Sequence, residues 1–124
     1  MSRDLSDNLD NLQVLIQRIE VSLKDRSYED YLNDRDLQDA TTYRLAMLGE
    51  ITGKLPDDVK ERHSDIPWDK IRGLRNVASH DYFSIIPDMV WEGTRSLEPI
   101  KQMIREELAR IEAERRSRDG GRTR

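Results

Sequence analysis

Residues 5–23 show most clearly how this chain folds, and they read LSDNLDNLQVLIQRIEVSL. Apolar side chains recur in this stretch at spacings of three and four residues, and Leu15 widens the stripe that they form. The members of the stripe are Leu5, Leu9, Leu12, Ile16, Ile19 and Leu23. Such spacing places them on one face of an α-helix. The stretch therefore predicts an amphipathic helix of about five turns.

The rest of the chain repeats this pattern in pieces that helix-start and helix-stop residues separate. Ser27 and Asp30 are three residues apart and resemble a capping box that opens a short helical turn. A second long helix is predicted from residue 33 or 34 onwards, and Gly53 with Pro56 ends it. Further helices are predicted at residues 56–63, from residue 67 to 79–81, and from residue 87 onwards with a kink or break at Pro99, while residues 81–86 are predicted to connect two of them.

Length and composition narrow the fold class. The 124 residues are 37% charged and 35% hydrophobic, and they suit one domain whose apolar side chains gather on few faces. The fold predicted is an all-α bundle of four to five helices. The chain has no cysteine, which excludes disulfide scaffolds, thiolate nucleophiles and cysteine-ligated zinc. Since no apolar run approaches the roughly 20 residues of a membrane span, we expect a soluble cytoplasmic protein.

Charge is distributed unevenly along the chain. Residues 115–124 hold five arginines and two adjacent glycines, so we predict a disordered basic tail there, after a domain of residues 1–114. That domain carries 16 basic and 24 acidic side chains, although residues 60–80 have a local net charge of +2. The sequence therefore favours one small anion-binding site over a broad nucleic-acid surface.

The densest cluster of chemically useful side chains reads RGLRNVASHDYF at residues 72–83. Arginine holds a phosphate through two parallel hydrogen bonds, and histidine transfers protons near neutral pH. RNA supplies its own nucleophile, the ribose 2′-hydroxyl, so its cleavage needs an acid or base, a cation and positioning, and no metal. These residue types therefore suit the cleavage of RNA phosphodiester bonds.

Helix geometry constrains how this cluster can work. On a continuous helix Arg75 and His80 point about 140° apart, whereas Asn76 and His80 are neighbours one turn apart. Either the helix unwinds around His80, or a second subunit supplies the missing partner across a two-fold axis. Gly73 lies inside the predicted helix and would permit close helix approach in such a dimer.

Arg75, His80 and Tyr82 together form the pattern Arg-x4-His-x-Tyr, which is the motif of the HEPN superfamily of small α-helical ribonucleases. The chain resembles most closely HepT, the toxin subunit of the HepT-MNT toxin-antitoxin systems. The segments that carry this closer resemblance are residues 38–40 with 45–50, residues 66–68, and residues 74–76 with 80–83. The similarity spans about residues 5–111.

The resemblance implies a role for each motif residue. Arg75 is expected to bind the scissile phosphate, and His80 to act as general acid or base. Asn76 is expected to orient His80 or the phosphate. Tyr82 occupies the position that an MNT nucleotidyltransferase modifies in HepT-like proteins by transferring AMP from ATP. The resemblance also implies a type VII-like toxin-antitoxin pair and a two-fold dimer with the motif in a cleft between protomers.

Several other residues have alternative interpretations. Lys70 and Arg72 are candidates for binding the RNA backbone, and His63 is expected to be a solvated helix end. Glu50 is either catalytic or the ion-pair partner of an arginine on the central helix. Acids at predicted helix starts, Asp34, Asp36, Asp57 and Asp58, are expected to be dipole partners and not metal ligands. Trp68, Phe83 and Trp91 are expected to fill the core or an interface, with RNA stacking as the alternative.

No cofactor is expected. One function of a different class stays open: a non-catalytic helical module that docks a nucleotidyltransferase or a nucleotide.

Overall fold

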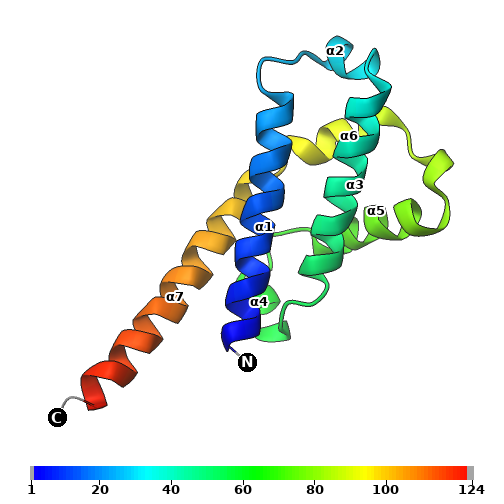
Figure 1. Cartoon of the computed structure of the whole chain (residues 1–124). Helices are drawn as coiled ribbons and strands as arrows, with labels where there is room; N and C mark the ends of the chain where they lie inside the picture. Colours follow the sequence, from blue (N-terminus) through cyan, green and yellow to red (C-terminus); the bar gives the residue numbers. More distant parts are fainter. Residues whose placement is uncertain (1, 123–124) are drawn as a thin grey trace.

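The computed structural model describes the backbone of residues 2–122 and the side chains of residues 4–119. Within that range the chain is all helical, as predicted, and contains no strand (Figure 1). The elements are α1 (Ser2–Leu23), α2 (Tyr28–Leu32), α3 (Arg35–Thr52), α4 (Asp57–Arg62), α5 (Trp68–His80), the 3₁₀ turn η1 (Tyr82–Ser84), α6 (Pro87–Thr94) and α7 (Glu98–Arg122).

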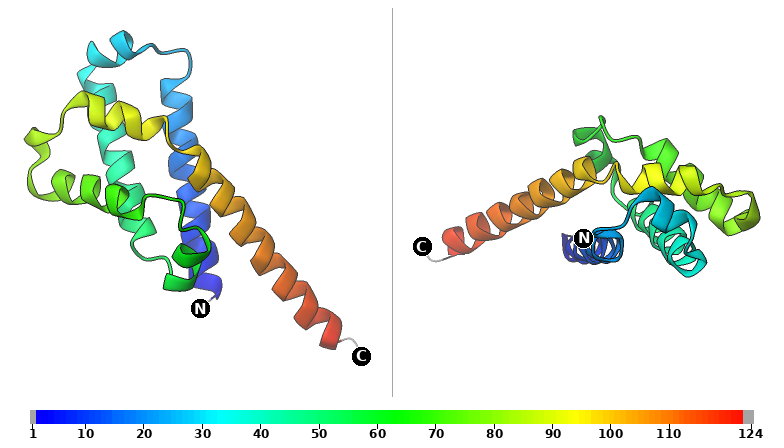
Figure 2. Two further views of the ribbon diagram at one scale, coloured as in Figure 1. Left: turned by 180° about the vertical axis from the view of Figure 1, so that it is seen from behind. Right: turned by 90° about the horizontal axis from the view of Figure 1, so that it is seen from above.

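The core forms where α1 packs against α3 on one side and α7 on the other (Figures 1 and 2). The predicted stripe of α1 supplies much of it, since Leu9, Leu12, Ile16 and Ile19 are at most 3% exposed. Leu37, Leu45 and Leu48 enter it from α3, and Val90, Ile100 and Ile104 enter it from α6 and α7. The hydrophobic periodicity therefore identified the buried faces of the long helices correctly.

Local capping fixes where the helices begin. The Ser27 hydroxyl accepts a hydrogen bond from the Asp30 amide at 3.0 Å, and the Asp30 carboxylate accepts one from the Ser27 amide at 3.0 Å. This confirms the predicted capping box ahead of α2. Asp34 then caps α3, because its carboxylate accepts a hydrogen bond from the Leu37 amide at 3.0 Å.

The break at Pro99 is confirmed, and it explains part of the difference in helix number. α6 ends at Thr94, and α7 begins at Glu98 with Pro99 in its first turn, where proline needs no hydrogen-bond partner. The predicted single last helix is therefore two helices. With the short helices α2 and α4 included, the described residues contain seven α-helices, more than the predicted four to five.

The end of α7 corrects a second expectation. Residues 115–122 were predicted to be a disordered tail, but the structure continues α7 to Arg122. The guanidinium groups of Arg115 and Arg116 lie 3.9 and 4.0 Å from the Glu112 carboxylate, the spacing at which charge pairs support a helix. This part of α7 projects away from the bundle, and its side chains from Glu112 to Asp119 are exposed (Figure 2). Residues 123–124 lie outside the described residues.

The prediction for His63 was wrong. This side chain is 8% exposed, and its Nε2 lies 2.7 Å from an oxygen of Glu107, which is itself only 1% exposed. Arg62 donates two hydrogen bonds to the same carboxylate, at 2.8 and 3.1 Å. These three residues join α4 to α7, and we call them the buried carboxylate cluster.

Candidate active site

The residues of the predicted motif lie on α5 and η1, which cover the outer side of α3. α5 packs chiefly on α3, yet none of its side chains is fully buried. Ile71 and Leu74 are half-buried and attach the helix to the core. The opposite face of α5 leaves its polar side chains accessible. α5 is therefore packed on α3 along one side and presents polar side chains to solvent on the other.

Gly49 explains how closely α5 approaches α3. A Cβ atom on Gly49 would lie 2.8 Å from the Arg75 Cβ atom and 3.0 Å from the Ile71 carbonyl oxygen, both too close for unstrained contact. Only glycine permits this crossing. It brings the base of the Arg75 side chain against α3, next to the following residue on that helix, Glu50.

Glu50 holds Arg75 in place. The Arg75 Nε atom donates a hydrogen bond of 2.6 Å to the Glu50 carboxylate, and its Nη1 atom donates one of 3.0 Å to the Asn76 side-chain oxygen. The ion-pair interpretation of Glu50 is thus confirmed, and Asn76 contacts Arg75. Since a guanidinium group carries five N–H donors, three remain for another acceptor. The Arg75 side chain is 37% exposed, so an anion can reach them.

His80 is the last residue of α5 and is exposed. α5 runs unbroken from Trp68 to His80, so one of the two predicted routes to a joint site, unwinding of the helix around His80, is wrong. The chain turns only at Asp81, whose φ of -153° leaves the helical region. Within one chain Arg75 and His80 therefore point in directions about 140° apart.

Tyr82 contacts α3 near the start of that helix, whereas Arg75 contacts it near the end. Its hydroxyl donates a hydrogen bond of 2.6 Å to the Asp39 carboxylate. Burial and this contact raise the pKa of Tyr82 above its ordinary value, so the phenol stays protonated near neutral pH. Asp39 and Glu50 are eleven residues apart, which places them on one face of α3 about 16 Å from each other. Because Asp39 shares this face with Glu50, the helical spacing could have identified Asp39 as a candidate site residue. That signal was not used in the prediction from sequence.

Phe83 was expected to fill the core or an interface, and it does not belong to the core. It is 94% exposed and packs edge-on against the Tyr82 ring, with ring centroids 5.7 Å apart. Trp68 and Trp91 do pack against the core, as expected. An aromatic ring this exposed beside the motif offers a stacking surface for a base or a partner.

The two cations proposed for backbone binding differ in their surroundings. Arg72 donates a hydrogen bond of 2.7 Å to Asp69, and both side chains are exposed. Lys70 lines a hollow of about 860 Å³ between α3, α5 and α6. Most of that hollow is apolar, with Ile71, Leu74 and Met89 among its lining residues.

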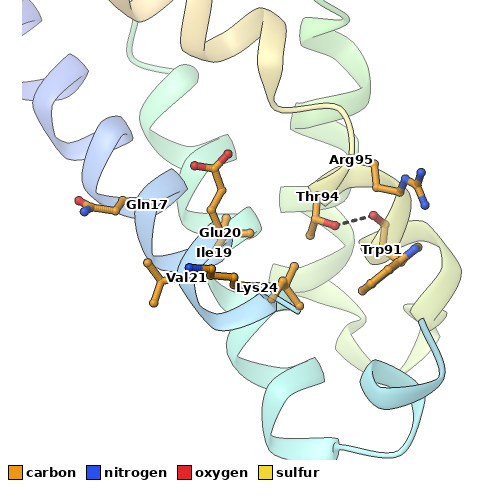
Figure 3. Close-up of a pocket in the computed structure, with 9 residues that line it drawn as sticks. Gln17, Ile19, Glu20, Val21, Lys24, Trp91, Thr94 and Arg95 are labelled. Atoms are coloured by element: carbon orange, nitrogen blue, oxygen red, sulfur yellow. Dashed lines mark hydrogen bonds between the residues drawn. The ribbon is translucent and has the colours of Figure 1, made fainter. Parts of the chain in front are cut away.

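Another hollow, between the end of α1 and α6, contains none of the motif residues. Figure 3 shows Glu20 and Lys24 on one side of it and Trp91, Thr94 and Arg95 on the other. Among the described residues no group of three or more histidine, aspartate or glutamate side chains is arranged to hold a metal ion. No helix in the described range is both long and apolar enough to cross a bilayer.

Known proteins resemble this chain in sequence. A family model described as "Ribonuclease HepT-like" matches residues 12–107. A protein of Caldanaerobacter subterraneus subsp. tengcongensis, which its name describes as a candidate RNase, is 34% identical over 84 residues, or 68% of this chain and 71% of its own length. "Probable ribonuclease HepT" of Thermococcus cleftensis is 30% identical over 92 residues, or 74% of this chain and 84% of its own length.

A third relative is longer than this chain. It is a Methanocaldococcus jannaschii protein named as a gamma-glutamylcyclotransferase and candidate RNase, and it is 28% identical over 111 residues. The match covers 90% of this chain and 49% of that protein. No solved structure matches the chain.

Proposed function

The chain belongs to the family of HepT-like ribonucleases, and from this premise we propose that it is a metal-independent endoribonuclease that acts in the cytoplasm as the toxin of a toxin-antitoxin pair. One observation carries the proposal. Glu50 holds Arg75 beside α3, where the Arg75 side chain is 37% exposed and three of its N–H donors have no partner among the described residues. A phosphate is the ligand that such a fixed and exposed guanidinium group binds best.

The proposed reaction uses few groups. The ribose 2′-oxygen attacks the adjacent phosphorus, the bond from phosphorus to the 5′-oxygen breaks, and a 2′,3′-cyclic phosphate and a 5′-hydroxyl result. Arg75 stabilises the extra negative charge of the pentacoordinate phosphate. His80 either takes the 2′-hydroxyl proton or gives a proton to the departing 5′-oxygen. Lys70 and Arg72 attract the flanking backbone, and their effect falls with added salt.

A two-fold dimer completes the proposed site. One chain directs Arg75 and His80 to different sides of an unbroken α5, so a single phosphate cannot meet both from one chain. Two copies related by a two-fold axis bring the Arg75 of one protomer to the His80 of the other, and form the site twice. Each of the two sites then draws on both chains.

The proposed antitoxin is an MNT-type nucleotidyltransferase that transfers AMP to the Tyr82 hydroxyl. The modification adds bulk and negative charge two residues from His80, which repels RNA sterically and electrostatically. Tyr82 is accessible enough for such an enzyme, since η1 lies on the surface and contains no buried residue.

The decisive experiment measures RNA cleavage by the purified full chain in the presence of a chelator. Arg75→Ala and His80→Ala are each expected to lower the rate by about 10²–10⁴-fold. Circular dichroism is expected to show an intact fold, because neither side chain is buried. Arg18→Ala, which removes an exposed arginine from α1, is the matched control and is expected to cleave normally. Full activity in both motif variants would favour the non-catalytic docking module.

Mixing the two inactive variants tests the dimer. If each site takes Arg75 from one chain and His80 from the other, every mixed dimer keeps one intact site, and about a quarter of the wild-type activity returns at equal mixing. If each site uses one chain alone, both sites of the mixed dimer stay defective. No recovery after subunit exchange would therefore overturn the shared site while leaving the nuclease proposal intact.

A further inference from the structure

The Tyr82 hydroxyl has a carboxylate partner in its own chain. Asp39 of α3 accepts a hydrogen bond from the Tyr82 hydroxyl at 2.6 Å, the usual distance when the acceptor is a carboxylate. Tyr82 lies on η1 and Asp39 lies 43 residues earlier in the chain, so this contact is tertiary and not a consequence of local helix geometry. The Tyr82 oxygen, the atom that would be modified, is therefore already hydrogen-bonded to a carboxylate that can take its proton.

The contact lies at a small cleft between α3, η1 and the start of α6. Its volume is about 70 Å³, and polar side chains from α3, Arg35, Gln38, Asp39 and Thr42, line one side. Arg35 is exposed, lies one turn before Asp39, and forms no ion pair within the described part of the chain. Tyr31 also lines the cleft, and its buried hydroxyl has no hydrogen-bond partner within the described part of the chain.

We propose that Asp39 is the general base for modification of Tyr82, and that Arg35 binds the arriving phosphate. The inference rests on the proposed function and adds to it: the chain itself supplies the groups that activate its acceptor tyrosine, and the nucleotidyltransferase supplies the nucleoside triphosphate. A phosphate is the ligand that fits a cleft with a free guanidinium group beside a phenol nucleophile.

The transfer forms one bond at the α-phosphorus and breaks another. The Tyr82 oxygen forms a bond to the α-phosphorus of the triphosphate, and the bond from that phosphorus to the oxygen bridging to the β-phosphorus breaks. Pyrophosphate leaves with the electron pair of the broken bond. The phenol proton passes to the Asp39 carboxylate, which afterwards releases it to water. The products are the AMP-tyrosyl ester and pyrophosphate, and no oxidant or further reactant is needed.

Two charges near the phenol have complementary effects in this step. Burial and the Asp39 carboxylate together stabilise the protonated phenol at rest. The same carboxylate repels an incoming phosphate, and the neighbouring Arg35 offsets that repulsion. Arg35 and Tyr82 line the same cleft, and the guanidinium group acts on the pKa of Tyr82 in the opposite direction to burial and Asp39.

The experiment measures AMP incorporation at position 82 of the full chain, with a purified MNT-type nucleotidyltransferase and ATP, by mass spectrometry over time. Asp39→Asn keeps the size and a hydrogen-bond acceptor but loses the base, and we expect transfer to slow by about 10²-fold. Asp36→Asn changes an exposed acid on the same helix and is the control. Arg35→Gln is expected to slow transfer less than Asp39→Asn does, with Arg18→Gln as its control.

A fluorinated tyrosine separates a base from a mere anchor. With 3,5-difluorotyrosine at position 82 the phenol is more acidic and needs less help in losing its proton, so the defect of Asp39→Asn is expected to shrink markedly. An anchoring role would leave the defect the same size for both phenols and would overturn the inference, as would normal transfer in Asp39→Asn. Absence of AMP from Tyr82 in the wild-type chain would instead overturn the proposed regulation, and the role of Asp39 with it.

Discussion

The molecule contains two groups of charged side chains that differ in what surrounds them. In the buried carboxylate cluster, Glu107 is 1% exposed and receives hydrogen bonds from Arg62, with His63 at 2.7 Å from it. On α3 and α5, Arg75 and Glu50 are each more than a third exposed, and Arg75 keeps three unused donors. Both groups pair an arginine with a glutamate, so the residue types alone do not distinguish them.

This difference in burial indicates that the buried carboxylate cluster stabilises the fold, whereas the exposed pair is available to bind a ligand. A carboxylate buried inside a protein is tolerated only when hydrogen bonds satisfy it, and breaking such a pair destabilises the fold. Burial alone would raise the pKa of Glu107, but the hydrogen bonds from Arg62 and His63 outweigh it and hold that pKa below its ordinary value. The exposed pair contributes little to stability, and its donors remain available to a ligand.

The largest effect is expected from Glu107→Ala. It removes the acceptor of three contacts and leaves a cavity between α4 and α7, so we expect the free energy of unfolding to fall by about 3 kcal/mol. Arg62 can still reach Asp58, which limits the loss. Urea denaturation measures the change. Glu106→Ala alters the exposed neighbour on α7 and should stay within about 0.5 kcal/mol of the wild type.

Gly49→Ala tests the exposed pair of Arg75 and Glu50. The new Cβ atom would meet Arg75 and the backbone of α5, so we expect α5 to shift, at a cost of about 1–3 kcal/mol in stability. Because the shift moves Arg75 away from Glu50, RNA cleavage should fall as well. Gly53→Ala is the control: its backbone φ is -62°, and its nearest neighbours lie at 3.4 Å. Equal effects of both substitutions would contradict the close-approach explanation.

The pH dependence of stability gives a smaller and more gradual effect. The pKa of Glu107 is lower in the folded chain than its ordinary value of 4.5. Its contribution is therefore fully present above about pH 4.5 and is lost as the pH falls towards the folded-state pKa. Thermal unfolding measured across this acidic range should show Tm falling more steeply for the wild type than for Glu107→Gln. Parallel curves would show that Glu107 is not the titrating group responsible.

The parts of the fold that follow from local rules were predictable. The capping box of Ser27 and Asp30, the stripe of α1 and the break between α6 and α7 ahead of Pro99 each depend on residues within a turn or two of one another. The helical end of α7 was missed because composition indicated disorder there, while the pairing of Glu112 with Arg115 and Arg116 supports continued helix.

The sequence singled out the candidate residues of the site, but it could not supply the contacts that those residues make. Arg75, His80 and Tyr82 were selected by their spacing, but Glu50, the partner of Arg75, is 25 residues away, and Asp39, the partner of Tyr82, is 43 residues away. His63 was misassigned for the same reason, since Glu107 lies 44 residues further on. A signal for Glu107 did exist, because it falls between Ile104 and Ile111 on the buried stripe of α7.

The smallest effect is expected from Gly73→Ala. This substitution tests whether the exposed side of α5 is covered by a second protomer. A Cβ atom on Gly73 would meet nothing within 4 Å, and the residue lies in the interior of α5. Alanine favours the helix over glycine, so the isolated chain should gain about 0.5–1 kcal/mol.

The proposed dimer changes that expectation only if a partner helix packs at Gly73. Analytical ultracentrifugation of the Gly73→Ala variant alongside its unfolding curve therefore separates the two cases. A gain in stability with unchanged dimerisation places the contact between protomers elsewhere on α5, nearer His80. Weaker dimerisation, with a stability that falls on dilution, would place Gly73 in the interface, and the exposed side of α5 would then be covered in the assembled protein.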